Sequence, residues 1–506
     1  MAQENPSKKK SVKKSGKKKP AGTRKRSAVK KAVKKKNPAG KKKAQKRGPA
    51  PKPSPTSSGK TSGKTASGKP SKKAAGKKAA AKGGGTKNIK VDHITKIEGH
   101  AKLNVKIDNG QVKKAKLSVF ESARFFESLV LCRRYDEASP LTSRICGICS
   151  PSHAITSILA TENAFNIKVS EQTHMLRDLL LYGTVFQNHV LHLYILALPD
   201  YFGYDSAIAM ASKYRDKIQM ALRLKQLGNE LVTVVGGREI HPITAVVGGF
   251  SKIPEQERLD QLLEKFRKLR PYAEKTVDIF SKLKYPKLKR DSQAFAFVND
   301  KHSFYKGKIN CVGGECIPKE NYDNVFEEHI KKGSTAKVVL YRNKPFFNGA
   351  LARLMVNGDS LSKDAKKYID RVDFSNPFHN NLAQAIEVLH SFDRIIEILE
   401  NLKVKDEKPV DFKVKAGRGI AYTEAPRGLV VHDYTYDKNG HMMKANIITP
   451  TTQNLKQMEE DLKTFLPPLL SRPKETIKQQ IEMLIRAYDP CFSCSAHFLD
   501  LKMERG

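Results

Sequence analysis

Two cysteine pairs, far apart in the sequence, constrain the fold of this chain more than any other feature. The first pair is Cys146 and Cys149, and the second, which begins 342 positions after Cys149, is Cys491 and Cys494. Two residues separate the members of each pair, and a histidine follows each pair within four residues. Four thiolates that converge on one point are soft ligands for a metal ion. A fold that uses them together must bring segments near residues 150 and 490 into contact.

Three kinds of site use cysteine pairs of this type. A structural zinc site has two pairs, but they usually lie about 15–20 residues apart. A thioredoxin-like redox site needs only one pair, placed after a strand. A catalytic metal centre can join distant segments, so the spacing alone leaves zinc and a catalytic metal open. The chain has seven cysteines, and an odd number without a secretory signal argues against a disulfide framework.

The first 88 residues differ in composition from the rest of the chain. They contain 31 of the 94 basic residues, a single acid, Glu4, and almost no large apolar side chain. Such a segment cannot bury enough surface to offset its ordering entropy, so we expect residues 1–88 to be a disordered basic tail. Its lysine blocks resemble linker-histone tails and predict binding to nucleic acid or another polyanion. A solubilising extension is the alternative.

The residues after the tail have the patterning of a folded body. Apolar residues alternate through 91–120 on both sides of Asn109-Gly110, which is typical of a β-hairpin. Helical periodicity predicts a mainly helical α+β body with small peripheral sheets near both ends, its helices lying within 172–198, 218–231, 259–269, 382–402 and 475–488. No uncharged apolar stretch of about 18 residues is present, so we expect no membrane span and a cytoplasmic protein.

The residues around the cysteines distinguish between the kinds of site. They read Arg144-Ile-Cys-Gly-Ile-Cys-Ser-Pro-Ser-His153 and Asp489-Pro-Cys-Phe-Ser-Cys-Ser-Ala-His497. Both segments resemble the signature motifs of the nickel–iron hydrogenase large subunit. Further matches carry the resemblance across about residues 90–497, at Ile97-Glu-Gly-His100, Arg124-Phe-Phe-Glu127 and Glu424-Ala-Pro-Arg-Gly428. Segments such as HITKIEGHAKLNV and TEAPRGLVV are most similar to the cytoplasmic NAD(P)-linked branch, the sulfhydrogenase alpha subunits.

This resemblance implies an organisation and an activity. Residues 89–497 would form the catalytic body, with the large-subunit fold of nickel–iron hydrogenases. Its reaction would be the reversible heterolytic cleavage of H₂ to protons and electrons. Mature members of the family end at the histidine that corresponds to His497, so we expect a maturation endopeptidase to remove residues 498–506.

The resemblance also implies a Ni-Fe(CN)₂CO centre held by the four cysteines. Cys146, Cys149, Cys491 and Cys494 would bind nickel, and Cys149 and Cys494 would bridge to an iron that carries two cyanides and one carbon monoxide. Soft thiolates suit a nickel ion that changes redox state. Glu98 would relay protons outward from Cys491, because a carboxyl group near a buried metal can exchange protons near neutral pH.

A second ion is implied at some distance from the cysteines. Glu127 and His497 would bind magnesium or another divalent ion, together with water and a backbone carbonyl near residues 447–448. An oxygen-rich site of this kind suits magnesium.

Four further residues would surround the metals. Arg427 would lie over their open face and polarise the arriving H₂, with Pro426 packed beside the diatomic ligands. Asp489 would pair with Arg427 and orient it. His153 would donate a hydrogen bond to the bridging Cys149.

The sequence departs from the family pattern at two positions. Asn188 occupies a position where many relatives have an aspartate that pairs with the arginine, and an amide cannot supply that charge. We therefore expect no ion pair on this side of Arg427. Lys96 likewise replaces a usual arginine before the Ile97-Glu-Gly-His100 run.

Electrons have to leave through other chains. Cys132, Cys311 and Cys316 match no ligand position, and no other cysteines remain to hold iron–sulfur clusters. We therefore expect an iron–sulfur small subunit as partner. Because no G-x-G-x-x-G motif follows a strand, flavin and NAD(P) would be bound by separate diaphorase subunits.

Two alternatives to the hydrogenase interpretation remain. The quinone-reducing subunit of complex I shares the fold, but it has lost the four cysteines. The other alternative is a basic nucleic-acid-binding protein with an inactive hydrogenase-like body. The presence of all four cysteines together with Glu98 and Arg427 argues against both.

Overall fold

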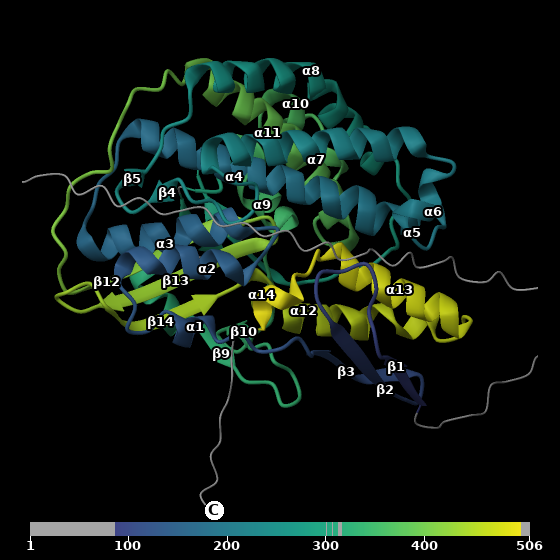
Figure 1. The fold of residues 1–506 in the computed structure, drawn as a ribbon. Coiled ribbons are helices and arrows are strands. Elements are labelled where there is room, and N and C mark those ends of the chain that lie inside the picture. Colours follow the sequence, from purple (N-terminus) through teal and green to yellow (C-terminus); the bar gives the residue numbers. More distant parts are fainter. Residues whose placement is uncertain (1–86, 300, 306, 312–315, 497–506) are drawn as a thin grey trace, which may run out of the picture. The chain divides into compact units, whose positions relative to one another are not determined.

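A computed structural model describes residues 87–299, 301–305, 307–311 and 316–496 (Figure 1). The segment 1–86, His497 and the segment 498–506 lie outside these described residues, so the predicted tail and C-terminal processing stay predictions. The first strand begins at Lys87 and so takes in the last two residues of the segment that the sequence assigns to the tail. No helix among the described residues is long and apolar enough to cross a membrane.

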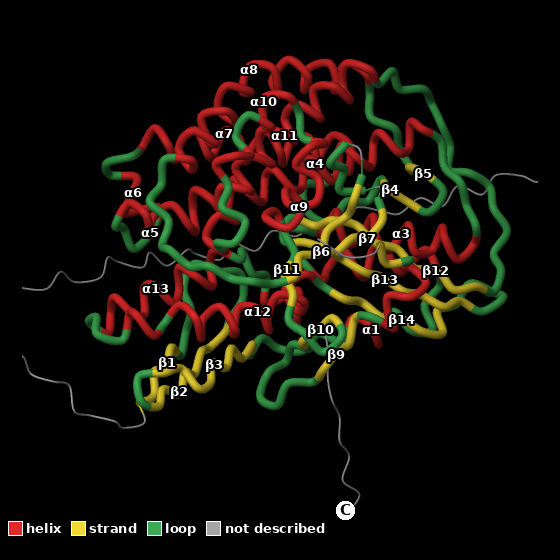
Figure 2. The backbone as a smooth tube through the Cα atoms, turned by 180° about the vertical axis from the view of Figure 1, so that it is seen from behind, coloured by secondary structure: helices red, strands yellow, loops and turns green. Residues whose placement is uncertain are grey.

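Helices are the main secondary structure of the body, as the periodicity predicts, and several of them are long. α4 packs against α7 and α11, and α11 also packs against α8. Figure 2 shows these helices gathered on one side of the body, with most strands on the other. Their bounds are α4 Glu171–Leu191, α7 Arg215–Gly236, α8 Gln256–Ser281 and α11 Asn380–Asn401. The prediction of a mainly helical α+β fold is confirmed.

The chain remains helical beyond the last residue of α4. The chain continues through a π-helical turn, His192–Ala197, into α5, Leu198–Phe202. The wider turn inserts a residue into the helical ladder, and such insertions often occur at functional sites. Here the turn follows directly on the part of α4 that carries Asn188.

The predicted hairpin is present near the start of the described residues. β2 and β3 pair antiparallel around Asn109 and Gly110, which both have positive φ angles of 48° and 75°, as a tight hairpin turn requires. β1 adds a third strand on the other side of β2. The sheet packs against α12 through β3, where the backbone N–H of Leu117 donates to Glu459 over 2.7 Å (Figure 1). The bounds are β1 Lys87–Val91, β2 Ala101–Asp108, β3 Gln111–Val119 and α12 Pro450–Phe465.

A second antiparallel sheet supports the segment that carries the first cysteine pair. Its strands are β12 Gly417–Ala425, β13 Gly428–Tyr436 and β14 Met442–Ile448, in that order. α3, Ser150–Phe165, packs closely on β12 and β13. A Cβ atom at Gly419 would lie only 1.9 Å from the carbonyl oxygen of Ala160, so glycine is required for this close approach. The packing fixes the start of α3, where the first cysteine pair lies.

Short strands between residues 293 and 347 were not predicted. They form a four-stranded sheet in the order β11-β6-β7-β8 and a separate antiparallel pair, β9 and β10. Each has at most six residues, too few for a clear alternation to appear in the sequence. Their bounds are β6 Gln293–Val298, β7 Lys308–Cys311, β8 Cys316–Ile317, β9 Phe326–His329, β10 Val338–Tyr341 and β11 Phe346–Phe347.

Shorter elements complete the described body. The strand pair β4 Ala245–Val246 and β5 Gly249–Phe250 follows α7. The remaining α-helices are α1 Phe126–Leu129, α2 Tyr135–Thr142, α6 Ala207–Ala211, α9 Ala350–Asn357, α10 Lys363–Lys366, α13 Lys474–Ala487 and α14 Phe492–Ser495. α13 ends just before Asp489-Pro490, as predicted, because proline disfavours helix in the residue before it.

Candidate metal centre

Four buried cysteine sulfurs meet where the start of α3 faces α14. Cys146 and Cys149 lie between the turn Ser143–Ile145 and α3, and Cys491 and Cys494 belong to the α14 segment. The sulfurs of Cys146 and Cys491 are 3.8 Å apart, and those of Cys149 and Cys494 are 3.9 Å apart. All four residues are at most 3% exposed. The fold therefore brings the two distant pairs to one point.

The geometry of the sulfurs fits soft-metal binding. The ligand atoms of Cys146, Cys491 and Cys494 lie within 4.8 Å of one another, as do those of Cys149, His153 and Cys494. Four sulfurs about 2.3 Å from one tetrahedral ion would be about 3.8 Å apart. The structure joins Cys491 and Cys494 in a disulfide, and because the thiolate is the ligating form, metal binding requires this pair to be reduced.

The surroundings favour a thiolate at Cys146. Burial opposes ionisation, but the hydrogen bonds from Cys149 and the charge of Arg427 outweigh it and lower the pKa of Cys146. The backbone N–H of Cys149 donates to the Cys146 sulfur over 3.1 Å. The pKa of Cys149 is raised well above its ordinary value, through the hydrogen bond with Cys146 and through burial. Two adjacent thiols thus share one readily formed negative charge.

Glu98 lies directly beside Cys491. Its Oε2 is 3.0 Å from the Cys491 sulfur and accepts a hydrogen bond from the Ser493 N–H over 3.1 Å. The backbone N–H of Phe492 donates to the Glu98 carbonyl over 3.0 Å. A Cβ atom at Gly99, which has φ +81°, would approach the Ser493 nitrogen to 2.8 Å. The glycine therefore permits the close contact that places the carboxyl group at the sulfur.

Arg427 is buried at the turn between β12 and β13, and two partners fix its guanidinium. Nη2 donates to Asp489 Oδ1 over 3.0 Å, and Nη1 donates to Asn188 Oδ1 over 3.2 Å. Although burial opposes the charge, the Asp489 carboxylate and the nearby thiols raise the pKa of Arg427 above its ordinary value. Asn188 thus contacts Arg427 as a neutral hydrogen-bond acceptor, and the ion pair comes from Asp489.

His153 is buried beside the cysteines, and Pro426, the residue before Arg427, is also buried. His153 Nδ1 lies 3.3 Å from His432 Nε2, and the other nitrogen of His432, Nδ1, is 2.6 Å from the hydroxyl of Tyr434. This contact orients the His153 ring, which lies next to the sulfurs of Cys149 and Cys494. Pro426 follows the end of β12, and its carbonyl accepts a hydrogen bond from Arg353.

Comparison with known proteins agrees with this geometry. The sequence matches the family described as Nickel-dependent hydrogenase over residues 124–221 and 296–497, and the one described as HoxL-like over residues 88–122. It is 37% identical to the sulfhydrogenase 1 subunit alpha of Pyrococcus furiosus, across 82% of this chain and 98% of that protein. The chain belongs to the nickel-dependent hydrogenase family. It is a catalytic large subunit, an oxidoreductase that acts on H₂.

Other relatives extend the same relationship. The chain is 26% identical to the NAD-reducing hydrogenase HoxS subunit beta of Cupriavidus necator, across 82% of this chain and 95% of that protein. It also resembles the crystal structure of an NAD⁺-reducing [NiFe]-hydrogenase in the H₂-reduced state, with a TM-score of 0.73 and 25% identity. That likeness covers 81% of this chain and 99% of the other. Membership of this family implies a nickel–iron centre, and the cysteine cluster is where it fits.

The predicted magnesium ligands are not both described. Glu127, at the start of α1, accepts a hydrogen bond from the backbone N–H of Ile447 over 3.0 Å, and Lys337 Nζ lies 3.5 Å from its carboxylate. His497 lies outside the described residues. Glu127 thus lies beside the strand near residues 447–448, which is expected to supply a backbone carbonyl to the ion, and the magnesium site stays a prediction.

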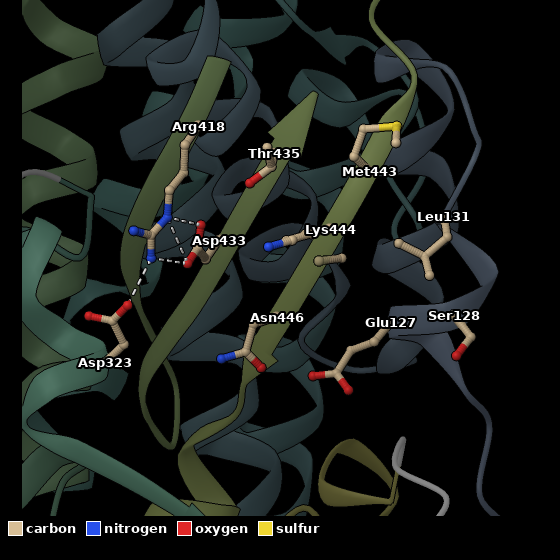
Figure 3. Close-up of a pocket in the computed structure, with 11 residues that line it drawn as sticks. Glu127, Ser128, Leu131, Asp323, Arg418, Asp433, Thr435, Met443, Lys444 and Asn446 are labelled. Carbon is tan, nitrogen blue, oxygen red and sulfur yellow. Dashed lines mark hydrogen bonds and ion pairs between the residues drawn. The ribbon is translucent and has the colours of Figure 1, made fainter. Parts of the chain in front are cut away.

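A groove beside Glu127 is separate from the cysteines. It encloses about 690 Å³, and Figure 3 shows Arg418 in it, paired with Asp433 and Asp323. Three of its charged side chains form ion pairs, Arg418 with both Asp433 and Asp323. It is lined by Glu127, Ser128, Leu131, Asp323, Arg418, Asp433, Thr435, Met443, Lys444, Ala445 and Asn446. Because no cysteine lines it, the hydrogenase chemistry does not belong to this groove.

Sequence reasoning missed a group of buried polar residues behind Arg427. Gln384 and Glu387 on α11 and Arg353 on α9 are each at most 1% exposed. A signal was present, since Gln384 and Glu387 interrupt the apolar stripe of a helix that the periodicity predicts to be buried. A buried polar or charged side chain needs a hydrogen-bonding partner, but the sequence alone does not show which residue that partner is.

Proposed function

We propose that this hydrogenase cleaves H₂ heterolytically and reversibly at the cysteine cluster, with Cys491 and Glu98 carrying the proton. When bound by the four cysteines, nickel and iron supply the redox and Lewis-acid chemistry that separates H₂ into protons and two electrons. The observation that carries this proposal is the convergence of four buried sulfurs with a carboxyl group in contact with one of them and an arginine nearby.

The proton route begins at a sulfur. A thiolate at Cys491 accepts a proton, and Glu98 Oε2, 3.0 Å away, is within hydrogen-bond distance to receive it. Glu98 is only half-buried, so its carboxyl group connects the buried sulfur to the protein surface. In the reverse reaction the same two atoms carry a proton inward.

Arg427 supplies a fixed positive charge at the cluster. Its contacts with Asp489 and Asn188 hold the guanidinium in one orientation, and its burial excludes water from that side. A preorganised cation in a dry site stabilises negative charge that develops during cleavage. His432 holds the ring of His153, and His153 in turn lies beside Cys149 and helps to orient its sulfur.

The electrons pass to other subunits in this proposal. We infer an iron–sulfur small subunit as the direct partner, because this chain has seven cysteines and four of them form the metal centre. The relationship to NAD-reducing and sulfhydrogenase subunits supports NAD(P) as the final acceptor, through diaphorase subunits. Assays of the purified complex with NAD⁺, NADP⁺ and ferredoxin distinguish these acceptors.

The proposal is tested by comparing two cysteine variants made with the protein's own maturation machinery. Cys146→Ser removes a metal ligand and should abolish H₂-dependent dye reduction and the infrared bands of bound CO and cyanide. Cys132→Ser is the matched control, because Cys132 is an exposed free cysteine, and it should retain both. Full hydrogen uptake by Cys146→Ser would refute the assignment of the site.

A further inference from the structure

Arg353 uses its whole guanidinium in hydrogen bonds next to the turn that carries Arg427. It lies on α9, is 1% exposed, and all five of its N–H groups donate hydrogen bonds. Two of them reach consecutive backbone carbonyls, that of Ala425 over 3.0 Å and that of Pro426 over 3.1 Å. These are the two peptide groups that precede Arg427.

Carboxylates on two other elements balance the charge of Arg353. Glu387 on α11 accepts from Arg353 Nε and Nη2, each over 2.7 Å, and Glu424 on β12 accepts from Nη1 over 3.0 Å. Glu387 also binds the Nε2 atoms of His189 at 2.8 Å and His302 at 3.0 Å. Although burial alone would raise it, the charge of Arg353 and these hydrogen bonds hold the pKa of Glu387 well below its ordinary value.

Helix α11 also acts on the side chain of Arg427, through Asp489. Gln384, one turn before Glu387 on α11, donates to Asp489 Oδ2 over 3.0 Å, and Asp489 Oδ1 accepts from Arg427. His192, in the π-helical turn, lies 2.6 Å from Gln384 Oε1 and holds the amide in place. α11 therefore contacts both the guanidinium of Arg427, through Asp489, and its backbone, through Arg353.

Close packing encloses the other side of the turn. A Cβ atom at Gly349 would lie 3.2 Å from the Arg427 carbonyl oxygen, and one at Gly428, which has φ +128°, would lie 2.2 Å from Asn348 Oδ1. Asn348 is itself held by Asn454, which accepts from its backbone N–H over 2.9 Å. The peptide groups on both sides of Arg427 are thus held against the start of α9.

We propose that Arg353 is a positioning residue for Arg427, which acts by holding the Ala425 and Pro426 carbonyls so that the guanidinium stays aimed at the cysteine cluster. This inference rests on the proposed function of Arg427. Buried ion pairs contribute little net stability, because desolvation offsets their attraction. The specific gain here is geometric, since only the planar fork of arginine reaches two carboxylates and two successive carbonyls together.

The test compares Arg353→Lys with a matched variant, Arg177→Lys. Arg177 is also fully buried and forms a two-pronged pair with a glutamate, Glu162, over 2.6 and 2.8 Å, but it makes no contact with the Arg427 turn. In Arg353→Lys the lysine keeps the charge but loses the fork. We expect kcat for H₂ oxidation to fall about 10–100-fold, with nickel content unchanged, whereas Arg177→Lys keeps kcat.

A second readout does not depend on activity. Amide hydrogen exchange of the full-length protein should show faster exchange at residues 427–428 in Arg353→Lys, and no change there in Arg177→Lys. If Arg353→Lys does not fold, the combined change Arg353→Met with Glu387→Gln and Glu424→Gln removes all three charges of this cluster. It should restore folding, keep fast exchange at residues 427–428, and keep kcat low.

The outcomes separate this inference from the proposed function. If the unmodified enzyme neither takes up nor produces H₂, the proposed function fails and the positioning role fails with it. If the unmodified enzyme is active but Arg353→Lys and Arg177→Lys lose activity equally, or exchange at residues 427–428 does not change, Arg353 is only structural.

Discussion

The contact between Cys491 and Glu98 makes a sharp prediction at the scale of single residues. Glu98→Gln preserves the shape of the side chain and its hydrogen bond with the Ser493 N–H, but the amide cannot exchange a proton. We expect H₂ oxidation to fall about 100-fold or more. The infrared bands of CO and cyanide and the nickel content should stay, because Glu98 is not a predicted ligand. Undiminished H/D exchange in this variant would place the proton route elsewhere.

Glu424 makes a second prediction, about pH. Burial raises its pKa to about 7, from an ordinary value of 4.5. Between these two values the folded state keeps a proton that the unfolded chain has released, so the contribution of Glu424 to stability falls as the pH rises and levels off above pH 7. A shift of this size corresponds to about 3 kcal/mol.

Glu424→Gln removes this titration and provides the measurement. Urea denaturation of the metal-free protein and of the variant at several pH values gives two free energies of unfolding at each pH. Relative to the variant, the unmodified protein should lose about 3 kcal/mol between pH 4.5 and 7. A difference that stays constant over this range would show that Glu424 is already ionised at low pH.

At the scale of elements, the position of the first cysteine pair depends on how closely α3 approaches β12. In Gly419→Ala the added Cβ would lie 1.9 Å from the Ala160 carbonyl and 2.4 Å from the Ala164 nitrogen, so helix and strand must separate. We expect a loss of about 3 kcal/mol of stability and reduced nickel content. Gly110→Ala is the control, since its Cβ meets nothing within 4 Å and only the positive φ costs about 1 kcal/mol. Equal thermal denaturation midpoints for the two variants would contradict this account.

Elements with a strong repeating pattern were predictable from the sequence. The hairpin around Asn109-Gly110 and the helices α4, α7, α8 and α11 match their predicted segments, because alternation and helical periodicity report directly which face is buried. The short strands between residues 293 and 347 were not predictable. Their pairing partners, such as the parallel contact of β11 with β6, depend on the tertiary fold and not on a local pattern.

The residues of the candidate site were likewise predictable only in part. The cysteine pairs, Glu98, Arg427 and Asp489 stand in recognisable motifs, and the structure brings them together. Arg353 and Gln384 stand in no such motif. Their partners come from different elements, so only the folded chain shows that they hold Arg427 and Asp489.

At the scale of the whole molecule, the fold connects segments that are distant in sequence. The connection between β1 and β2 supplies Glu98, and the start of α3 supplies one cysteine pair. The α14 segment supplies the other pair, and the β12–β13 turn supplies Arg427. A buried site assembled from so many segments exists only when the entire body is folded. Metal binding, which occurs in the folded state only, should therefore stabilise the body as a unit.

The basic segment before β1 is expected to be separable from this assembly, and its removal gives the last prediction. Residues 1–86 contain 30 of the 94 basic residues, so their deletion lowers the formal net charge from +43 to +14 and leaves β1 intact. Because a segment with almost no apolar side chains cannot contribute to the buried metal site, H₂ oxidation per nickel should be unchanged. Retention on immobilised DNA should fall sharply, and in the full-length protein it should weaken steeply as salt is raised. A variant of full length with these lysines and arginines changed to glutamine separates charge from length, and it should bind as poorly as the deletion. Equal DNA retention by all three proteins would show that the body, and not this segment, makes the contact.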